Sequence, residues 1–344
     1  MNEVHFVVPD GIDDPSRPSG GNVYDRRACR GLAALGWSVR EQTVPGRWPR
    51  PDAPSRAAVA GALARVPSGA VVLVDGLVAS VVPEVLEPEA SRLRLVVLVH
   101  MPRDEPSEVA ALSAASAIVV TSEWTRRWLS DHYALAGTPV YIVPPGVDAA
   151  EVAAGTPSGG RLLCVAGVTP LKGHDVLLDA LATVDDPAWQ CVCVGALDLD
   201  LEFVARLRRL AEDRSLGDRV CFTGPLMDDE LDRAYAQADV LVLASRAETY
   251  GMVVTEALAR GLPVIACEVG GVPEALGHAA DGSRPGLLVP PGDPQTLGQT
   301  LSWWLGDPRE RERLRAAARS RRQRLTDWAQ TSRELSAALS EVAG

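Results

Sequence analysis

The chain has 344 residues, of which 47% are hydrophobic and 23% charged, and its formal net charge is −11. This composition is typical of a folded protein, and the length suits two domains of about 150 residues each. Because the balance is acidic, we do not expect nucleic acid to bind over a broad surface, although a local pocket can still bind phosphates.

Neither a targeting signal nor a zinc site is expected. The first residues enter a strand-like run without the basic and apolar regions of a signal peptide, and no stretch has the roughly 18 consecutive apolar residues of a transmembrane helix. The six cysteines are Cys29, Cys164, Cys191, Cys193, Cys221 and Cys267. Most lie in apolar runs, where Cys behaves as a small core residue, and their spacing does not fit zinc. These features predict a cytoplasmic protein.

The first half alternates Val-rich runs with segments whose apolar residues recur at helical spacing. Runs with so little polar alternation are typical of parallel strands buried on both faces. The predicted strands are Val4–Val8, Val39–Val44, Ala70–Val74, Leu93–Val99, Ala117–Val120 and Val140–Val143. The predicted helices include Tyr24–Leu35, Ser55–Arg65 and Glu123–His132. This alternation predicts a doubly wound α/β sheet.

A second series of the same kind follows a break at Pro144-Pro145-Gly146. Residues 153–160 are rich in Ala, Gly, Pro and Ser, and we interpret them as a linker. The predicted strands of this half are Arg161–Ala166, Gln190–Val194, Arg219–Phe222, Val240–Leu243, Pro263–Ala266 and Gly286–Val289. We therefore predict two Rossmann-like domains, residues 1–150 and 151–325, that face each other across a ligand cleft. A last helix over 326–344 is expected to pack back on the first domain.

The segment Arg309–Arg324 contains eight arginines and two glutamates. We interpret it as a solvated amphipathic helix, because Leu314 and Leu325, which directly follows the segment, are the only large apolar residues here. Contact of this basic helix with an anionic surface is the alternative interpretation.

The strongest functional signal lies between Ala244 and Glu274. A helix is predicted to begin at Gly251-Met252, after the strand Val240–Leu243, and to end at Gly261. The backbone N–H groups at the start of a helix have no intrahelical partners, and the helix dipole adds positive potential there. Such a helix start suits a diphosphate.

Two carboxylates bracket this helix start. Glu248 lies in the loop before the helix, and Glu256 follows eight positions later, within the helix. Glu248 would then lie beside the group attached to the phosphate, and Glu256 could accept hydrogen bonds from a vicinal diol such as a ribose. The structural alternative is that Glu248 caps the helix and Glu256 is merely exposed.

Three neighbouring features favour a ligand site. Lys172 lies at a strand-to-helix turn, where a cation would face a phosphate. Gly20 and Gly21 are placed between the first strand and the first helix, and adjacent glycines let the backbone approach a ligand. His100 directly follows the strand Leu93–Val99 and is expected to point into the same cleft. The G-x-G-x-x-G motif of an ordinary dinucleotide dehydrogenase is not found at the first strand-to-helix turn.

Together these motifs resemble the family 4 glycosyltransferases of the GT-B architecture over nearly the whole chain. The resemblance rests on Gly20-Gly21, His100-Met101-Pro102, Thr121-Ser122-Glu123-Trp124, Pro144-Pro145-Gly146-Val147-Asp148, Lys172-Gly173, the Glu248 and Glu256 pair, Gly270-Gly271-Val272-Pro273-Glu274 and Gly286-Leu287-Leu288-Val289. The two-glutamate motif followed by G-L-P-V-I-A and G-G-V-P-E is highly specific. The resemblance implies a retaining hexosyltransferase that needs no metal or other cofactor and uses a UDP- or GDP-linked sugar as donor.

The resemblance also implies roles for residues. The first domain lies on the acceptor side, and the second binds the nucleotide sugar. Glu248 would contact sugar hydroxyls near the reacting carbon, His100 the transferred sugar, and Lys172 the diphosphate; these three are the implied catalytic residues. The implied donor-binding residues are Gly20, Gly21, Arg246, Tyr250, Gly251, Met252, Val253 and Glu256. Because the departing diphosphate gathers negative charge, N–H donors and a lysine held in place would stabilise the transition state.

The lysine loop departs from the family pattern. The usual glycine-arginine pair is absent, since no Arg lies between Gly167 and Lys172. Arg246, near the other loop, could supply the second cation. Asp198 and Asp200 have the spacing of a metal clamp, but we interpret them as a helix start and predict no metal site.

Other function classes stay open at this point. The rival enzymes are a glycan phosphorylase and a nucleotide-sugar epimerase on the same architecture. The alternative from another class is a catalytically weak GT-B protein that binds nucleotide sugar or a partner. The acceptor is unidentified and can be a small molecule, a glycan or a lipid. Trp124, Arg126, Arg127 and Trp128 allow a peripheral membrane contact, but packing of the tryptophans in a core is favoured.

Overall fold

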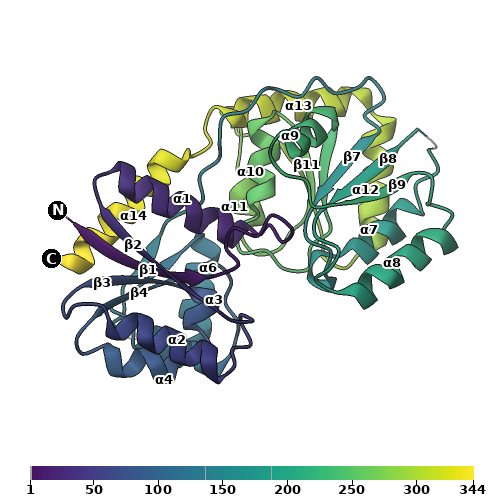
Figure 1. Cartoon of the computed structure of the whole chain (residues 1–344). Coiled ribbons are helices and arrows are strands. Elements are labelled where there is room, and N and C mark those ends of the chain that lie inside the picture. The colour runs from purple at the N-terminus through teal and green to yellow at the C-terminus, as the bar shows by residue number, and fades with distance from the viewer. Residues whose placement is uncertain (1, 136, 187) are drawn as a thin grey trace. The chain divides into compact units, whose positions relative to one another are not determined.

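Figure 1 shows the computed structural model of the chain, which describes residues 2–135, 137–186 and 188–344. The chain divides into two compact units. The first holds the residues up to Asp14, Gly20–Gly146 and Thr326–Gly344, and the second holds Pro15–Ser19 and Val147–Leu325. Each unit contains one six-stranded sheet whose neighbouring strands are parallel, so the predicted doubly wound α/β class is confirmed.

The sheet of the first unit has the strand order β2-β1-β3-β4-β5-β6. The bounds are β1 Glu3–Pro9, β2 Ser38–Val44, β3 Val71–Asp75, β4 Arg94–Val99, β5 Ala117–Val120 and β6 Val140–Ile142. Strands β3 and β5 are buried along their whole length, and β4 is buried except at its first residue. Burial on both faces explains their nearly uninterrupted Val, Leu and Ile, and each strand lies where an apolar run predicted it.

Helices cover both faces of this sheet (Figure 1). Their bounds are α1 Gly20–Ala34, α2 Ala53–Ala64, α3 Gly76–Ala79, α4 Pro83–Leu86, α5 Pro106–Ser113, α6 Glu123–His132 and α14 Trp328–Ala343, with a short 3-10 turn at Glu87–Glu89. Successive residues of the strands point to opposite faces of the sheet and pack in two separate apolar clusters. Phe6 and Leu98 pack with residues of α1 and α14, whereas Val72 and Val97 pack with residues of α2, α5 and α6.

The carboxyl-terminal helix belongs to the first unit, and α14 lies along α1 (Figure 1). Trp37 Nε1 donates a hydrogen bond to Ser336 Oγ at 2.9 Å. A Cβ atom at Gly31 of α1 would lie 1.8 Å from Ser332 Oγ, so the two helices can approach this closely only with a glycine there.

The sheet of the second unit has the order β12-β11-β10-β7-β8-β9. The bounds are β7 Arg161–Val165, β8 Gln190–Val194, β9 Val220–Gly224, β10 Val240–Leu243, β11 Val264–Cys267 and β12 Gly286–Val289. The helices are α7 His174–Leu181, α8 Leu201–Asp213, α9 Asp228–Gln237, α10 Met252–Ala259, α11 Val272–Leu276, α12 Pro294–Gly306 and α13 Pro308–Arg322, with a 3-10 turn at Pro170–Lys172. Asp200 caps α8 by accepting from the Phe203 N–H at 2.9 Å, which confirms the predicted helix start.

Residues 153–160, which we interpreted as a linker, are part of the second unit and are anchored to it. The hydroxyl of Thr156 donates to Asp239 at 2.6 Å, and Trp304 Nε1 donates to the carbonyl of Gly159 at 2.8 Å. Asp239 is fully buried and also pairs with Arg315 at 2.9 Å. These partners lie far away in the sequence, so local composition could not reveal them.

The basic segment in α13 is only partly solvated, which corrects a second interpretation. Arg311 is buried and donates to the carbonyls of Trp304 and Leu305 at 2.8 and 2.6 Å. Arg322 donates to the carbonyl of Ala259 at 2.6 Å. Guanidinium groups that bind the free carbonyls of helix ends stabilise the fold and are no longer available to an anionic surface.

Candidate functional site

The second sheet changes direction between β7 and β10. These two strands are neighbours, yet the chain runs from β7 outward through β8 and β9 before it returns to β10. Ligands of open α/β sheets bind at such a switch point, outside the carboxyl ends of the strands. The loops that follow β7 and β10 meet there, because a Cβ atom at Gly173 would lie 2.0 Å from the carbonyl oxygen of Ala244.

An ion pair joins these two loops. Lys172 Nζ lies 2.6 Å from Glu248 Oε1, and the hydroxyl of Ser245 donates to the same oxygen at 2.9 Å. The Glu248 side chain is 10% exposed and that of Lys172 is 24% exposed. Two predicted catalytic residues, 76 positions apart, therefore lie in contact in a mostly buried setting.

The helix after this pair has an open amino terminus. Gly251 precedes α10 in the left-handed region, with φ of 91°, and no side chain caps the helix. Met252 and Val253 follow in its first turn, where N–H groups lack intrahelical partners. Tyr250 has its ring buried in the core, and burial raises the pKa of its hydroxyl to about 12, so this residue offers a ligand mainly its backbone.

A glycine pair after β11 closes around the backbone of Glu248. Gly270 has φ of 54°, and a Cβ atom there would lie 1.5 Å from the Glu248 carbonyl oxygen. The N–H of Gly271 donates to that same carbonyl at 3.1 Å. The sequence comparison included this pair in the G-G-V-P-E motif without a role, and the structure shows that it supports the loop of Glu248.

Arg246 forms hydrogen bonds with the loop that contains Lys172 and with the helix that follows it. Its guanidinium binds Asp175 through two hydrogen bonds of 2.9 Å and also donates to the carbonyl of Pro170. Its backbone N–H donates to the carbonyl of Leu171 at 2.8 Å. Arg246 therefore holds the turn that carries Lys172, and as a second cation for the donor it stays a prediction.

Glu256 lies in α10 and is partly buried. Its Oε2 accepts a hydrogen bond from the Tyr235 hydroxyl at 2.8 Å, and the Tyr235 ring is fully buried beneath the Arg260 guanidinium. Burial raises the pKa of the Glu256 carboxyl above its usual range. Glu256 is thus partly buried and hydrogen-bonded, which differs from the alternative of a merely exposed glutamate.

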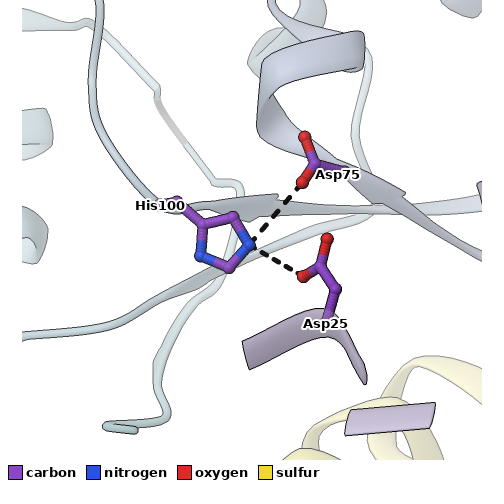
Figure 2. A group of neighbouring side chains, drawn as sticks. All are labelled: Asp25, Asp75 and His100. Carbon is purple, nitrogen blue, oxygen red and sulfur yellow. Dashed lines mark hydrogen bonds and ion pairs between the residues drawn. The ribbon is translucent and has the colours of Figure 1, made fainter. Parts of the chain in front are cut away.

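In the first unit His100 lies at the end of β4, as predicted, and meets two aspartates (Figure 2). His100 Nε2 lies 2.8 Å from Asp25 Oδ1 and 3.7 Å from Asp75 Oδ2. Asp25 comes from α1 and Asp75 ends β3, and both carboxyl groups are buried. In the described part of the chain these three form a group whose possible metal-ligand atoms all lie within 4.8 Å of one another.

Gly20 and Gly21 lie in the first turn of α1, which corrects their placement before the helix. A Cβ atom at Gly21 would lie 3.1 Å from His100 Cδ2, tighter than most real contacts. Gly21 therefore makes room for the imidazole ring. Sequence reasoning placed this glycine near phosphates and did not foresee its contact with His100.

Burial dominates the electrostatics of this cluster. Burial raises the pKa of Asp25 to about 7. Burial also raises the pKa of Asp75 well above its usual range, and the negative charge of Asp25 raises it further. Burial lowers the pKa of His100, which favours the neutral imidazole. Sequence reasoning missed both aspartates, although Asp75 was visible as a carboxylate that ends an otherwise apolar strand.

The aromatic and basic helix α6 is largely internally paired. Trp128 stacks on His132 at 4.2 Å between ring centroids and packs against the core of the first unit. Arg126 and Arg127 bind Glu123 at 2.6 and 2.8 Å. Within the described residues no helix combines the length and apolar character needed to cross a bilayer.

Comparison with known proteins identifies the second unit. Residues 156–321 match the family Glycosyl transferases group 1. The second unit belongs to this family. The resemblance that the motifs predicted is therefore confirmed, and the matched region contains Lys172, Arg246, Glu248 and Glu256.

Relatives of the chain include two D-inositol 3-phosphate glycosyltransferases. The chain is 34% identical to that of Jonesia denitrificans over 248 residues, which is 66% of this chain and 57% of the relative. It is also 34% identical to that of Frankia alni over 229 residues, which is 61% of this chain and 55% of the relative. These alignments thus span little more than half the length of either relative.

Two solved structures match the whole fold. Sucrose-phosphate synthase from Thermosynechococcus elongatus has a TM-score of 0.80 at 23% identity, with 99% of both chains covered. Anabaena HepE in complex with UDP-glucose has a TM-score of 0.76 at 18% identity, covering 99% of this chain and all of the other. The GT-B fold of the family is thereby established for this chain.

Lys172 has a further distinction within this sequence. It is the single lysine of the chain, beside 33 arginines. Lysine places a compact point charge on a flexible stem, whereas arginine presents a planar fork. Lys172 is therefore the one side-chain ammonium group in the sequence.

Proposed function

We propose that the chain is a retaining, metal-independent glycosyltransferase that transfers a hexosyl group from a nucleotide diphosphate sugar to a hydroxyl acceptor. The observation that carries this proposal is the meeting of Lys172 and Glu248 beside the uncapped start of α10, at the switch point of the second sheet. An ammonium group and free backbone N–H groups suit a diphosphate, and a carboxylate beside them suits sugar hydroxyls.

The chemistry follows from where charge develops. When the bond between the sugar and the diphosphate breaks, negative charge grows on the leaving phosphate oxygens. Lys172 and the N–H groups of Met252 and Val253 would stabilise this charge more in the transition state than in the ground state. The leaving diphosphate can then accept the proton of the acceptor hydroxyl. Glu248 would hold the sugar by its hydroxyls and favour positive charge at the reacting carbon.

A uridine donor is the first to test. The HepE structures contain UDP-glucose or UDP, and their fold is that of this chain. Glu256, in the helix that follows the proposed diphosphate site, would accept hydrogen bonds from the ribose. The Tyr235 hydroxyl, which donates to Glu256 Oε2, would then share that carboxylate with the ribose. D-inositol 3-phosphate belongs in the acceptor panel because the names of relatives specify it.

The single lysine permits a direct binding experiment. Reductive methylation with ¹³C-formaldehyde labels Lys172 and the terminal amine only, and both give separate methyl signals. Addition of UDP-glucose, GDP-mannose or ADP-glucose should shift the Lys172 signal for one nucleotide and leave the other amine unchanged. A thermal-shift series with the same sugars on the unlabelled protein checks affinity, since a ligand of the folded state raises the melting temperature.

Transfer is then measured as release of the nucleotide diphosphate in the presence of each acceptor, with and without EDTA. Release that depends on an acceptor and persists in EDTA supports the proposal. Binding of a nucleotide sugar without release across the whole panel would favour the alternative, a catalytically weak protein that binds nucleotide sugar. Failure of every nucleotide sugar to move the Lys172 signal would overturn the site.

A further inference from the structure

We propose that Asp25 and Asp75 are positioning residues that hold His100 as its Nε2–H tautomer and leave Nδ1 to accept a hydrogen bond from a sugar hydroxyl. The proposal rests on the proposed function only for the nature of the ligand. The tautomer itself is a property of the first unit alone.

The geometry assigns the two ring nitrogens to different tasks. Nε2 faces the carboxyl groups, with Asp25 Oδ1 at 2.8 Å, whereas Nδ1 points away from both aspartates (Figure 2). Among the described residues Nδ1 has no hydrogen-bond partner, and the His100 side chain is 18% exposed. The nitrogen that a ligand can reach is therefore Nδ1.

The positions of the protons in the cluster follow from the rule that each buried polar atom needs a hydrogen-bond partner. Two neighbouring buried carboxyl groups cannot both ionise, so one keeps a proton. Asp75 Oδ1 accepts from the Leu77 N–H at 2.6 Å, whereas Asp25 Oδ2 is buried and receives no donor from outside the cluster. Asp25 and Asp75 each offer a carboxylate oxygen within 4.8 Å of the other. A proton on Asp75 that is donated to Asp25 supplies the missing donor and leaves Asp25 ionised.

Above about pH 7, where Asp25 is ionised, this carboxylate decides the state of the ring. A carboxylate can only accept, so the short contact to Nε2 requires a hydrogen on Nε2. With the imidazole neutral, Nδ1 then carries a lone pair. A lone pair repels the oxygens of a phosphate, which carry no hydrogen, and attracts the hydrogen of a hydroxyl. His100 thereby discriminates in favour of a sugar or another polyol against a bare anion.

The packing around the ring keeps this arrangement in place. The edge of Tyr24 meets His100 at 5.3 Å between ring centroids, and the Tyr24 hydroxyl is fixed to the carbonyl of Val143 at 2.9 Å. The backbone of Gly21 lies against the ring where a Cβ atom would crowd it. The imidazole therefore cannot turn its nitrogens round without disturbing α1, which carries Tyr24 and Asp25.

The test is a nitrogen spectrum that needs no substrate. The protein is labelled with ¹⁵N-histidine and observed at pH 8, and His100→Gln identifies which of the five histidines gives the His100 signals. We expect one protonated nitrogen at Nε2 and one unprotonated nitrogen at Nδ1. An Nδ1–H tautomer or an imidazolium in the wild-type spectrum would overturn the proposal, whatever the enzyme does.

Two variants test the roles of the carboxyl groups separately. Asp75→Asn keeps a neutral hydrogen-bond donor beside Asp25, so His100 should remain the Nε2–H tautomer. Asp25→Asn removes the anion, and its amide can turn either its oxygen or its NH2 group toward Nε2, so the Nδ1–H tautomer should become populated, with kcat at least tenfold lower than in Asp75→Asn. Asp131→Asn, an exposed aspartate on α6, is the matched control. An unchanged tautomer in folded Asp25→Asn contradicts the proposal.

Two further measurements separate the rival accounts. Elemental analysis of protein purified without chelators should find no stoichiometric divalent cation; a cation that shifts Nε2 and is lost in Asp25→Asn would make the cluster a metal site and overturn the proposal. If the expected tautomer is present but no nucleotide sugar binds, the proposed function fails while the assignment of His100 stands.

Discussion

Lys172 Nζ lies 2.6 Å from Glu248 Oε1, so the proposed phosphate-binding cation and the proposed sugar-binding acid are in direct contact. A diphosphate that binds Lys172 would compete with this contact and release Glu248 oxygen atoms for the sugar. Donor binding and the orientation of Glu248 are therefore expected to be coupled.

Lys172→Arg should lower kcat by at least about tenfold, because the planar guanidinium cannot occupy the same point between Glu248 and a phosphate. Steady-state kinetics with the donor identified by the binding experiment measure this loss. Arg214→Lys is the matched control, since it makes the opposite exchange at an exposed ion pair with Asp179 in the same unit. Equal rates for Lys172→Arg and wild type would show that any cation serves.

Glu248→Gln should lower transfer by about 100-fold or more, because the negative charge that favours the reacting carbon is lost. The amide oxygen of Gln can still accept from Lys172 and Ser245, so the melting temperature should stay close to that of wild type. Full activity in a folded Glu248→Gln protein would refute the assigned role.

Gly270→Ala should destabilise the loop that carries Glu248 and abolish donor binding. The left-handed backbone alone costs about 1–2 kcal/mol for a residue with a side chain. The added Cβ would also lie 1.5 Å from the Glu248 carbonyl oxygen. Gly292→Ala is the control, because Gly292 has φ of 71° but open space around it. Urea unfolding and thermal shift with donor should separate the two variants; similar losses would mean that backbone strain alone matters.

Arg246→Ala should raise the donor KM by about three- to tenfold with a smaller change in kcat, because the lysine loop loses its anchor to Asp175. If Arg246 instead contacts the diphosphate itself, Asp175→Asn should free it and strengthen donor binding. If the ion pair serves to hold the loop, both variants should weaken donor binding. The two measurements therefore distinguish the two roles of Arg246.

The stability of the protein should depend on pH through Asp25. Its pKa is raised from 3.8 to about 7, so the folded state keeps a proton that the unfolded state releases between these values. This contribution is complete below pH 3.8 and is lost as the pH rises to about 7. The stability of wild type relative to Asp25→Asn should therefore fall from pH 5 to pH 8 in urea unfolding.

The neighbours of Asp25 set the conditions of that comparison. Asp75 also has a raised pKa, His100 has a lowered one, and Arg26 contributes a positive charge. The effect of His100 has the opposite sign, because stability is lost as the pH falls and the unfolded histidine takes up a proton. It is present in both proteins and largely cancels in their difference. Parallel curves for the two proteins would contradict a raised pKa at Asp25.

Local sequence patterns were enough to predict the fold and part of the site. Each predicted strand of the described residues is present, since a buried parallel strand must be apolar along its length whatever its neighbours are. The start of α10 at Met252 was also predicted, because glycine before a helical repeat marks the boundary by itself.

Contacts between distant residues were decided by the tertiary structure. Asp25 and His100 are 75 positions apart and meet because β4 and α1 lie beside each other, and no pattern within either segment contains that information. The same holds for Arg246, whose pairing with Asp175 depends on β7 and β10 being neighbours. Sequence periodicity by itself determined which segments are strands and helices, as well as the family motif of the second unit. The sheet order decided which polar side chains share a site, because it alone sets which loop ends lie together.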